Sequence, residues 1–118
     1  MVAPARGAVV LVRFPFSDLS KTKLRPAVVL ADVGRGDSIL CQVTSKPYAD
    51  PATVVLEQAA FASGSLQVTS YARPSKLFTA SRELITAEVG VLKQEALTQI
   101  VDAVVALLRP TTVSAPEP

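Results

Sequence analysis

The chain has 118 residues, a net charge of +2 and an apolar fraction of 49%, which together predict one domain with a buried core. It contains no histidine, and this absence excludes histidine general bases, serine–histidine pairs and histidine-ligated zinc. Its single cysteine excludes an intrachain disulfide and a multi-cysteine metal site. We therefore expect no metal ion and no cofactor, so any catalysis has to use arginine, lysine, carboxylates or hydroxyls.

Short runs of β-branched residues in the first half of the chain indicate buried strands. Pro26 fits the head of the second run, because the first residue of a strand need not donate to the ladder. The polar segment 15–24 before it predicts a loop, and the Gly-Arg-Gly-Asp sequence at residues 34–37 predicts a hairpin turn. The three strands are expected at residues 8–14, 26–33 and 38–44.

The second half continues with short strands after a loop at residues 45–51. An irregular turn is expected at residues 58–63. Pro74 separates two strand candidates, and Gly90 indicates a bulge or a close approach within the last strand. These strands are predicted at residues 53–56, 66–71, 75–79 and 84–92.

Residues 94–109 change to a helical period, and Pro110 ends the pattern. Many short strands followed by one amphipathic helix predict a mainly β protein, a small and strongly bent barrel with a C-terminal α-helix packed on it. We expect a single domain over residues 1–110 and a flexible tail at 111–118. The inward face of the helix is predicted to carry Leu97, Ile100, Val101, Val104, Leu107 and Leu108.

Nothing in the sequence predicts export or membrane insertion. The N-terminus lacks the apolar core of a signal peptide, and the longest apolar run, residues 103–108, is far too short to span a bilayer. The lone Cys41 suits a reducing compartment, so we expect a cytoplasmic protein. Cys41 itself is interpreted as a small buried hydrophobe, the alternative being a reactive thiol.

Positive charge is concentrated at one end of the sequence. Residues 1–48 hold seven basic and three acidic residues, whereas residues 49–118 hold five basic and seven acidic ones. If the basic loops meet at one end of the barrel, they form a cationic groove that suits nucleic-acid phosphates, with Phe16, Tyr48 and Tyr71 near enough to stack on bases. The alternative is a solvated basic rim with no function.

Arg25 is the first candidate for chemistry, because it precedes Pro26 at the start of an apolar strand and is thereby held extended. A guanidinium there can grip a phosphate bidentately and stabilise a phosphoryl transition state. The alternative is a structural salt bridge to an acid such as Asp18. The antiparallel hairpin brings Arg25 to the same end as Thr44 and Ser45, two hydroxyls that alternatively only cap the following turn.

The carboxylates are too scattered along the chain to predict a two-metal nuclease. Metal-free RNA cleavage stays open, because RNA carries its own nucleophile in the 2′-hydroxyl. An enzyme then only has to position that hydroxyl, stabilise the phosphorane and protonate the leaving oxygen.

Four segments of the sequence resemble a known protein family and occur in the same order as in that family. They are Gly-Ala-Val-Val-Leu-Val-Arg-Phe-Pro-Phe-Ser-Asp-Leu (7–19), Lys-Leu-Arg-Pro-Ala-Val-Val-Leu (23–30), Leu-Cys-Gln-Val-Thr-Ser (40–45) and Ser-Tyr-Ala-Arg-Pro-Ser-Lys-Leu-Phe-Thr (70–79). Together with the closing helix, the chain resembles the MazF/PemK toxins of bacterial type II toxin–antitoxin systems over residues 6–108.

The resemblance implies an SH3-like barrel, a homodimer and a metal-independent endoribonuclease that cuts single-stranded mRNA at short sequences. The products are a 2′,3′-cyclic phosphate and a 5′-hydroxyl. The family's catalytic arginine and threonine fall on Arg25 and Thr44, with Ser45 as a neighbouring candidate. The residues expected to contact RNA are Phe16, Ser17, Lys21, Lys23, Lys46, Tyr71, Arg73 and Lys76.

The implied partner is a small antitoxin whose acidic extended tail fills the RNA groove, and DNA binding is also implied. The mean hydropathy of +0.37 favours a second copy, since it indicates apolar surface left over for a partner. Some relatives place an acid in the segment 70–76, whereas this sequence has none there. Arg25 then has to act alone as proton donor. The alternative function is a non-catalytic barrel that binds RNA or protein, such as a degenerate toxin.

Overall fold

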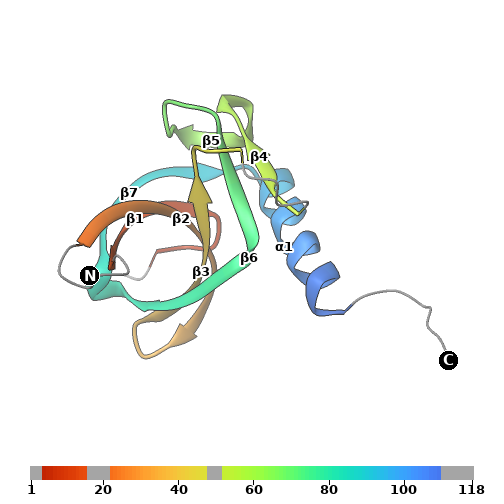
Figure 1. Ribbon diagram of the computed structural model, residues 1–118. Helices are drawn as coiled ribbons and strands as arrows, with labels where there is room; N and C mark the ends of the chain where they lie inside the picture. The colour runs from red at the N-terminus through yellow and green to blue at the C-terminus, as the bar shows by residue number, and fades with distance from the viewer. Residues whose placement is uncertain (1–3, 16–21, 48–51, 110–118) are drawn as a thin grey trace, which may run out of the picture.

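The computed structural model describes residues 4–15, 22–47 and 52–109. In this part of the chain, seven strands are followed by one helix (Figure 1). Two short 3-10 helices, η1 (Gln58–Ala60) and η2 (Arg82–Leu84), precede the fifth and seventh strands. The elements are β1 (Ala8–Pro15), β2 (Thr22–Gly34), β3 (Asp37–Thr44), β4 (Val54–Leu56), β5 (Phe61–Gly64), β6 (Ser70–Ser81), β7 (Ile85–Leu92) and α1 (Gln94–Leu108).

All seven strands belong to one antiparallel sheet with the order β4-β6-β3-β2-β1-β7-β5. The sheet curls into a half-barrel, with α1 beside it (Figure 1). The predicted hairpin at residues 34–37 is present, and its two central residues, Arg35 (φ 58°) and Gly36 (φ 81°), both take the left-handed conformation of a tight hairpin turn. The predicted fold class, a bent β structure with a C-terminal helix, is confirmed.

Both faces of the sheet are buried, and neighbouring residues along a strand contribute to opposite faces. On β1, Val9 belongs to a cluster that includes helix residues, whereas Val10 belongs to a cluster made only of strand residues. Val28 and Ala27 on β2 divide in the same way. The helix therefore covers one face, which we call the helix-side core. The curl of the sheet encloses the other face.

Two elements differ from the sequence prediction at prolines. β2 starts at Thr22, earlier than predicted, and Pro26 lies inside it opposite Leu11 of β1. Pro26 is tolerated there because the ladder to β3 begins only at Ala27, so no bond on that side is lost. The end of the predicted strand 66–71 and the predicted strand 75–79 belong to one strand, β6, whose ladder to β3 is interrupted between Ala72 and Leu77. Pro74 sits in this interruption.

The short strand β5 replaces part of the irregular turn predicted at residues 58–63. It packs so closely on β7 that a Cβ at Gly64 would lie 2.2 Å from the Val89 carbonyl oxygen. A Cβ at Gly90 would lie 2.8 Å from the Phe61 ring. The prediction of a close approach at Gly90 is confirmed, because only glycine leaves room for the neighbouring strand.

Helix α1 buries Leu97 and Ile100 in the helix-side core and contacts β4, β6 and β7. Val101 and Val104 pack partly against the same core. The inward positions predicted for Leu107 and Leu108 are wrong, since these side chains are 46% and 77% exposed on the last helical turn. No helix in the described ranges is both long and apolar enough to cross a bilayer.

Candidate active site

The antiparallel register brings Arg25 and Thr44 together at one end of the β2–β3 hairpin. Ala27 and Gln42 form the first pair of the β2–β3 ladder, and Arg25 and Thr44 each lie two residues beyond that pair. Thr44 is paired with Tyr71 of β6. Side chains two residues apart along a strand project from the same face, as do those of directly paired residues, so Arg25, Thr44 and Tyr71 lie on one face in a row across three strands.

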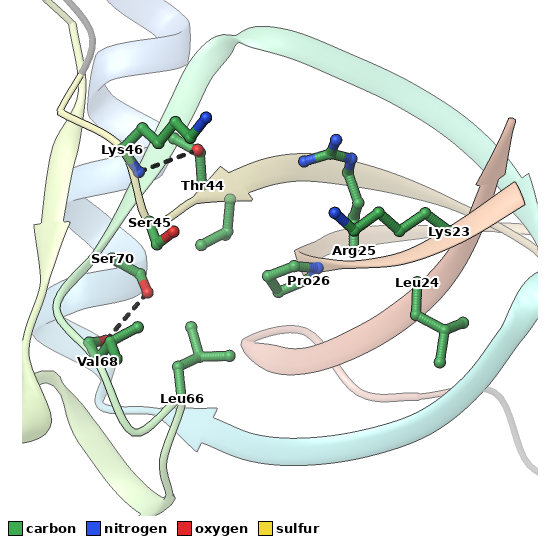
Figure 2. A pocket seen from close by; sticks show the side chains of 11 residues that line it. Lys23, Leu24, Arg25, Pro26, Thr44, Ser45, Lys46, Leu66, Val68 and Ser70 are labelled. Atoms are coloured by element: carbon green, nitrogen blue, oxygen red, sulfur yellow. Dashed lines mark hydrogen bonds between the residues drawn. The ribbon is translucent and has the colours of Figure 1, made fainter. Parts of the chain in front are cut away.

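A hollow of about 330 Å³ lies at this end of the sheet, and we call it the cationic groove (Figure 2). Three basic side chains line it, and no carboxylate is found among its described lining residues. Several positive charges lining one hollow favour a phosphate-bearing ligand. The lining residues are Lys23, Leu24, Arg25, Pro26, Val43, Thr44, Ser45, Lys46, Leu66, Val68 and Ser70.

Arg25 owes its position to the extended backbone of β2 and to the following proline, which restricts the residue before it. Its side chain is half-buried and rises on the side of the groove where the Thr44 hydroxyl lies (Figure 2). Arg25 also lines a smaller hollow with Gln42 and Phe78. Arg25 therefore borders both the cationic groove and this smaller hollow. The proposed salt bridge to Asp18 falls outside the described residues.

Thr44 is buried, with 8% of its surface exposed, and its Oγ1 accepts a hydrogen bond of 3.2 Å from the Lys46 backbone N–H. The interpretation of Thr44 as a turn cap is therefore confirmed. The cap does not exclude a role in binding, because an accepted bond leaves the hydroxyl proton available for donation. Ser45 is exposed at the rim of the same groove.

The remaining predicted contact residues divide by position. Lys23 and Lys46 line the cationic groove. Tyr71 is paired with Thr44 but does not line the groove. Arg73 and Lys76 lie in the interrupted part of β6, away from the lining residues. Phe16, Ser17 and Lys21 lie outside the described residues, as does Tyr48.

Sequence reasoning missed one wall of the groove, formed by Leu66, Val68 and Ser70. The strand predicted at residues 66–71 starts too early, because residues 65–69 form a loop. The buried Ser70 Oγ donates to the Val68 carbonyl at 3.1 Å, which holds the loop against β6. The signal in the sequence is a pair of apolar residues between polar neighbours, Leu66 and Val68, of which the structure leaves Val68 59% exposed.

Cys41 takes no part in this site. It is fully buried in the helix-side core, and burial raises the pKa of its thiol to about 12, although a backbone hydrogen bond from Arg73 acts in the opposite direction. A thiol with this pKa is a poor nucleophile, so the interpretation as a buried hydrophobe is confirmed. Within residues 4–15, 22–47 and 52–109, no three Cys, Asp or Glu side chains gather as a metal site would require.

Residues 5–108 match the family described as "PemK-like, MazF-like toxin of type II toxin-antitoxin system". The chain belongs to this toxin family. The resemblance drawn from the four sequence segments is thereby confirmed. A comparison with curated protein sequences found no significant match.

Solved structures of the family share the fold at low sequence identity. A MazE–MazF complex from Deinococcus radiodurans is 20% identical, with a TM-score of 0.74 over 91% of this chain and 97% of that one. An endoribonuclease in complex with its cognate antitoxin, from a mycobacterial species, is 18% identical, with a TM-score of 0.68 over 92% and 95%. The MazF-mt6 toxin of Mycobacterium tuberculosis is 12% identical, with a TM-score of 0.64 over 84% and 95%.

Proposed function

We propose that this toxin is a metal-independent endoribonuclease that cleaves single-stranded mRNA at short sequences in the cytoplasm. The observation that carries the proposal is the convergence of Arg25 and Thr44 in a groove lined by three cations and by no described carboxylate. Such a site attracts the phosphate backbone and offers hydrogen-bond donors to a phosphorane. The family assignment supports the same activity.

The reaction uses the 2′-hydroxyl of the substrate as the nucleophile. The 2′-oxygen bonds to the adjacent phosphorus and its proton passes to solvent, while the bond from phosphorus to the 5′-oxygen breaks. The Arg25 guanidinium stabilises the added negative charge through two parallel hydrogen bonds, and the Thr44 hydroxyl donates a third. The products are a 2′,3′-cyclic phosphate and a 5′-hydroxyl.

The leaving 5′-oxygen also needs a proton. Since the described lining of the groove contains no carboxylic acid, we assign this proton to Arg25, which recovers one from water. Arginine releases a proton reluctantly, so the step depends on the strong basicity of the departing alkoxide. Ser45, at the rim, is the nearest additional hydroxyl for the same phosphate.

The other basic side chains bind the parts of the RNA strand that flank the reacting phosphate. Lys23 and Lys46 are exposed on two sides of the groove and suit the neighbouring phosphates. Arg73 and Lys76 extend the positive surface along β6, and Tyr71 offers a ring for stacking. Phe16, Ser17 and Lys21, outside the described residues, complete the proposed contacts.

The proposed protein partners are an antitoxin and a second copy of the chain. An acidic extended tail of an antitoxin has the charge to fill the cationic groove and exclude RNA. The solved complexes of family members with antitoxins support this partner. Exposed apolar side chains such as Leu24, Leu77 and Leu84 support a homodimer, which light scattering at micromolar concentration tests directly.

Incubating the purified protein with single-stranded RNA in excess chelator tests the activity and its independence of metal together. We expect fragments that carry a 2′,3′-cyclic phosphate and a 5′-hydroxyl, identified by mass spectrometry. Cleavage that stops in chelator contradicts the mechanism. Binding without any cleavage favours the alternative of a degenerate, non-catalytic barrel.

A further inference from the structure

A second hollow of about 200 Å³ adjoins the cationic groove. The two share a wall, because Leu66 and Val68 line both of them. Figure 2 shows these two side chains at the edge of the groove, beside Ser70. A strand whose phosphate lies at Arg25 and Thr44 therefore has this second hollow within reach of an adjacent nucleotide.

The chemistry of the second hollow is opposite to that of the groove. No Lys or Arg is found among its described lining residues. The polar residues that line it are instead uncharged or acidic, and two buried apolar side chains, Leu56 and Phe61, line it as well. These polar residues are Glu57, Gln58, Ser65, Gln67 and Thr69. An apolar floor with a few hydrogen-bonding groups suits a flat neutral heterocycle and repels a phosphate.

The loop that forms the shared wall is held in place at several points. The Ser65 backbone N–H donates to the Val89 carbonyl at 3.2 Å, and the Ser65 hydroxyl accepts from the Gln67 N–H at 2.8 Å. The Ser70 hydroxyl fixes the Val68 carbonyl. Gln67 itself has a positive φ of 74°, a conformation that a non-glycine residue adopts only when its surroundings impose it. A wall fixed in this way presents the same groups to every ligand.

We propose that the second hollow binds a guanine base of the RNA strand whose phosphate occupies the cationic groove. This inference rests on the proposed function and adds a specificity site to it. Guanine is favoured because its Watson–Crick edge offers two adjacent donors, N1–H and the 2-amino group, to the Glu57 carboxylate. Its O6 is left to accept from Thr69 or Gln67. Uracil and cytosine place a carbonyl or ring-nitrogen acceptor next to their donor, which the carboxylate repels.

The size of the hollow agrees with a single base. Drug-sized ligands occupy pockets of roughly 300–1,000 Å³, so about 200 Å³ limits the occupant to one ring system. Phe61, which lines the hollow, is buried and lies close against Gly90 of β7.

Binding of short 2′-O-methyl RNAs tests the inference without cleavage, because these strands lack the nucleophile. Oligonucleotides that differ at one position among the four bases are titrated by fluorescence anisotropy, the position being moved along the strand. We expect a preference for guanine of about tenfold at one position, since one recognised base contributes about that much. Glu57→Gln is expected to reduce it to threefold or less, and Thr69→Val to weaken it.

Two controls separate recognition of the base from attraction to the backbone. Glu95→Gln neutralises an exposed carboxylate in the first turn of α1 and should leave the preference unchanged. Lys46→Ala should weaken binding of all four oligonucleotides equally, because it removes a phosphate contact. Circular dichroism of each variant verifies the fold.

Cleavage of unmodified RNA is measured in parallel, so that the inference and the proposed activity are judged separately. A parent protein that cleaves RNA but binds all four bases equally overturns the guanine site alone. The same holds if Glu57→Gln keeps the full preference. A guanine preference that depends on Glu57, without any cleavage, supports the site and overturns the catalytic proposal. No binding of any oligonucleotide overturns both.

Discussion

Two regions of this molecule are separated by a single peptide bond at the end of β3. Val43 is fully buried in the helix-side core, while the next residue, Thr44, faces the row that contains Arg25. The core side is apolar and is covered by α1, whereas the groove side is polar and carries three cations. The alternation of a β-strand is thus enough to place a reactive surface directly on a rigid support.

The difference predicts how substitutions divide. Groove residues contribute little to packing, so changing them should affect the reaction and leave the fold intact. Core residues that do not line the groove, which excludes Val43, contribute no atom to it, so changing them should lower stability and leave the folded protein equally active. Each of the following experiments tests whether effects on activity and effects on stability are separate.

Arg25→Ala should have the largest effect, lowering kcat/KM for single-stranded RNA by about 10³-fold or more, because a charged donor to the phosphorane is lost. The melting temperature should stay close to that of the parent. Arg109→Ala, which removes the same charge at the end of α1, is the matched control and should cleave normally. A variant at Arg25 that cleaves like the parent contradicts its catalytic role.

Ile100→Ala should lower the free energy of unfolding by about 2–5 kcal/mol, because Ile100 is fully buried and its loss leaves a cavity. Urea denaturation followed by circular dichroism measures this change. At a temperature where the variant is folded, kcat/KM should match that of the parent. A large loss of activity in the folded variant would show that the core and the groove are not independent.

Thr44→Val keeps the shape of the side chain and removes the hydroxyl. We expect a decrease in kcat of about 10- to 100-fold and a loss of stability of about 1 kcal/mol, since the Lys46 N–H loses its acceptor. Thr44→Ser restores the hydroxyl and should recover most of both losses. If the valine variant loses stability alone, Thr44 is only a turn cap.

Cys41 gives the smallest effect, and it appears only at alkaline pH. Because burial raises its thiol pKa from 9.0 to about 12, the folded chain keeps a proton that the unfolded chain releases between these values. The stability contribution is therefore full below pH 9 and declines as pH rises toward 12, by at most about 1.4 kcal/mol per pH unit. Cys41→Ala should show a shallower decline in pH-dependent urea denaturation; an identical slope rejects the buried thiol as its cause.

Much of the fold was predictable because local rules were sufficient. Alternating and β-branched runs predicted β1 and β3 to within about a residue, and the Gly-Arg-Gly turn predicted the hairpin that joins β2 to β3. Prolines were misleading, since Pro26 and Pro74 both lie inside strands. Whether a proline interrupts a strand depends on which side of that strand is paired, and this pairing is known only once the sheet is assembled.

The candidate site divides in the same way. The proximity of Arg25 and Thr44 follows from one hairpin and could be predicted from the sequence. The wall at Leu66 and Val68 could not, because it depends on a loop fixed by Ser70 and by Val89 of β7. The sequence also could not show that Tyr71, Arg73 and Lys76 stay outside the groove lining. Arg73 and Lys76 lie where the ladder between β3 and β6 is interrupted, and this interruption is a feature of the assembled sheet.

β1 lies inside the sheet, between β2 and β7, and this position affects the order in which parts of the protein fold. β2 and β3 are joined locally, but β1 also pairs with β7, so that the Leu92 N–H bonds the Gly7 carbonyl at 2.9 Å across most of the chain. Closing so long a loop is slow, in roughly the range of milliseconds to seconds. During synthesis, Arg25 and Thr44 can meet early, whereas the wall at Leu66 is secured only after β7 has been made. The proposed catalytic pair can therefore form before the surface that is proposed to select the base.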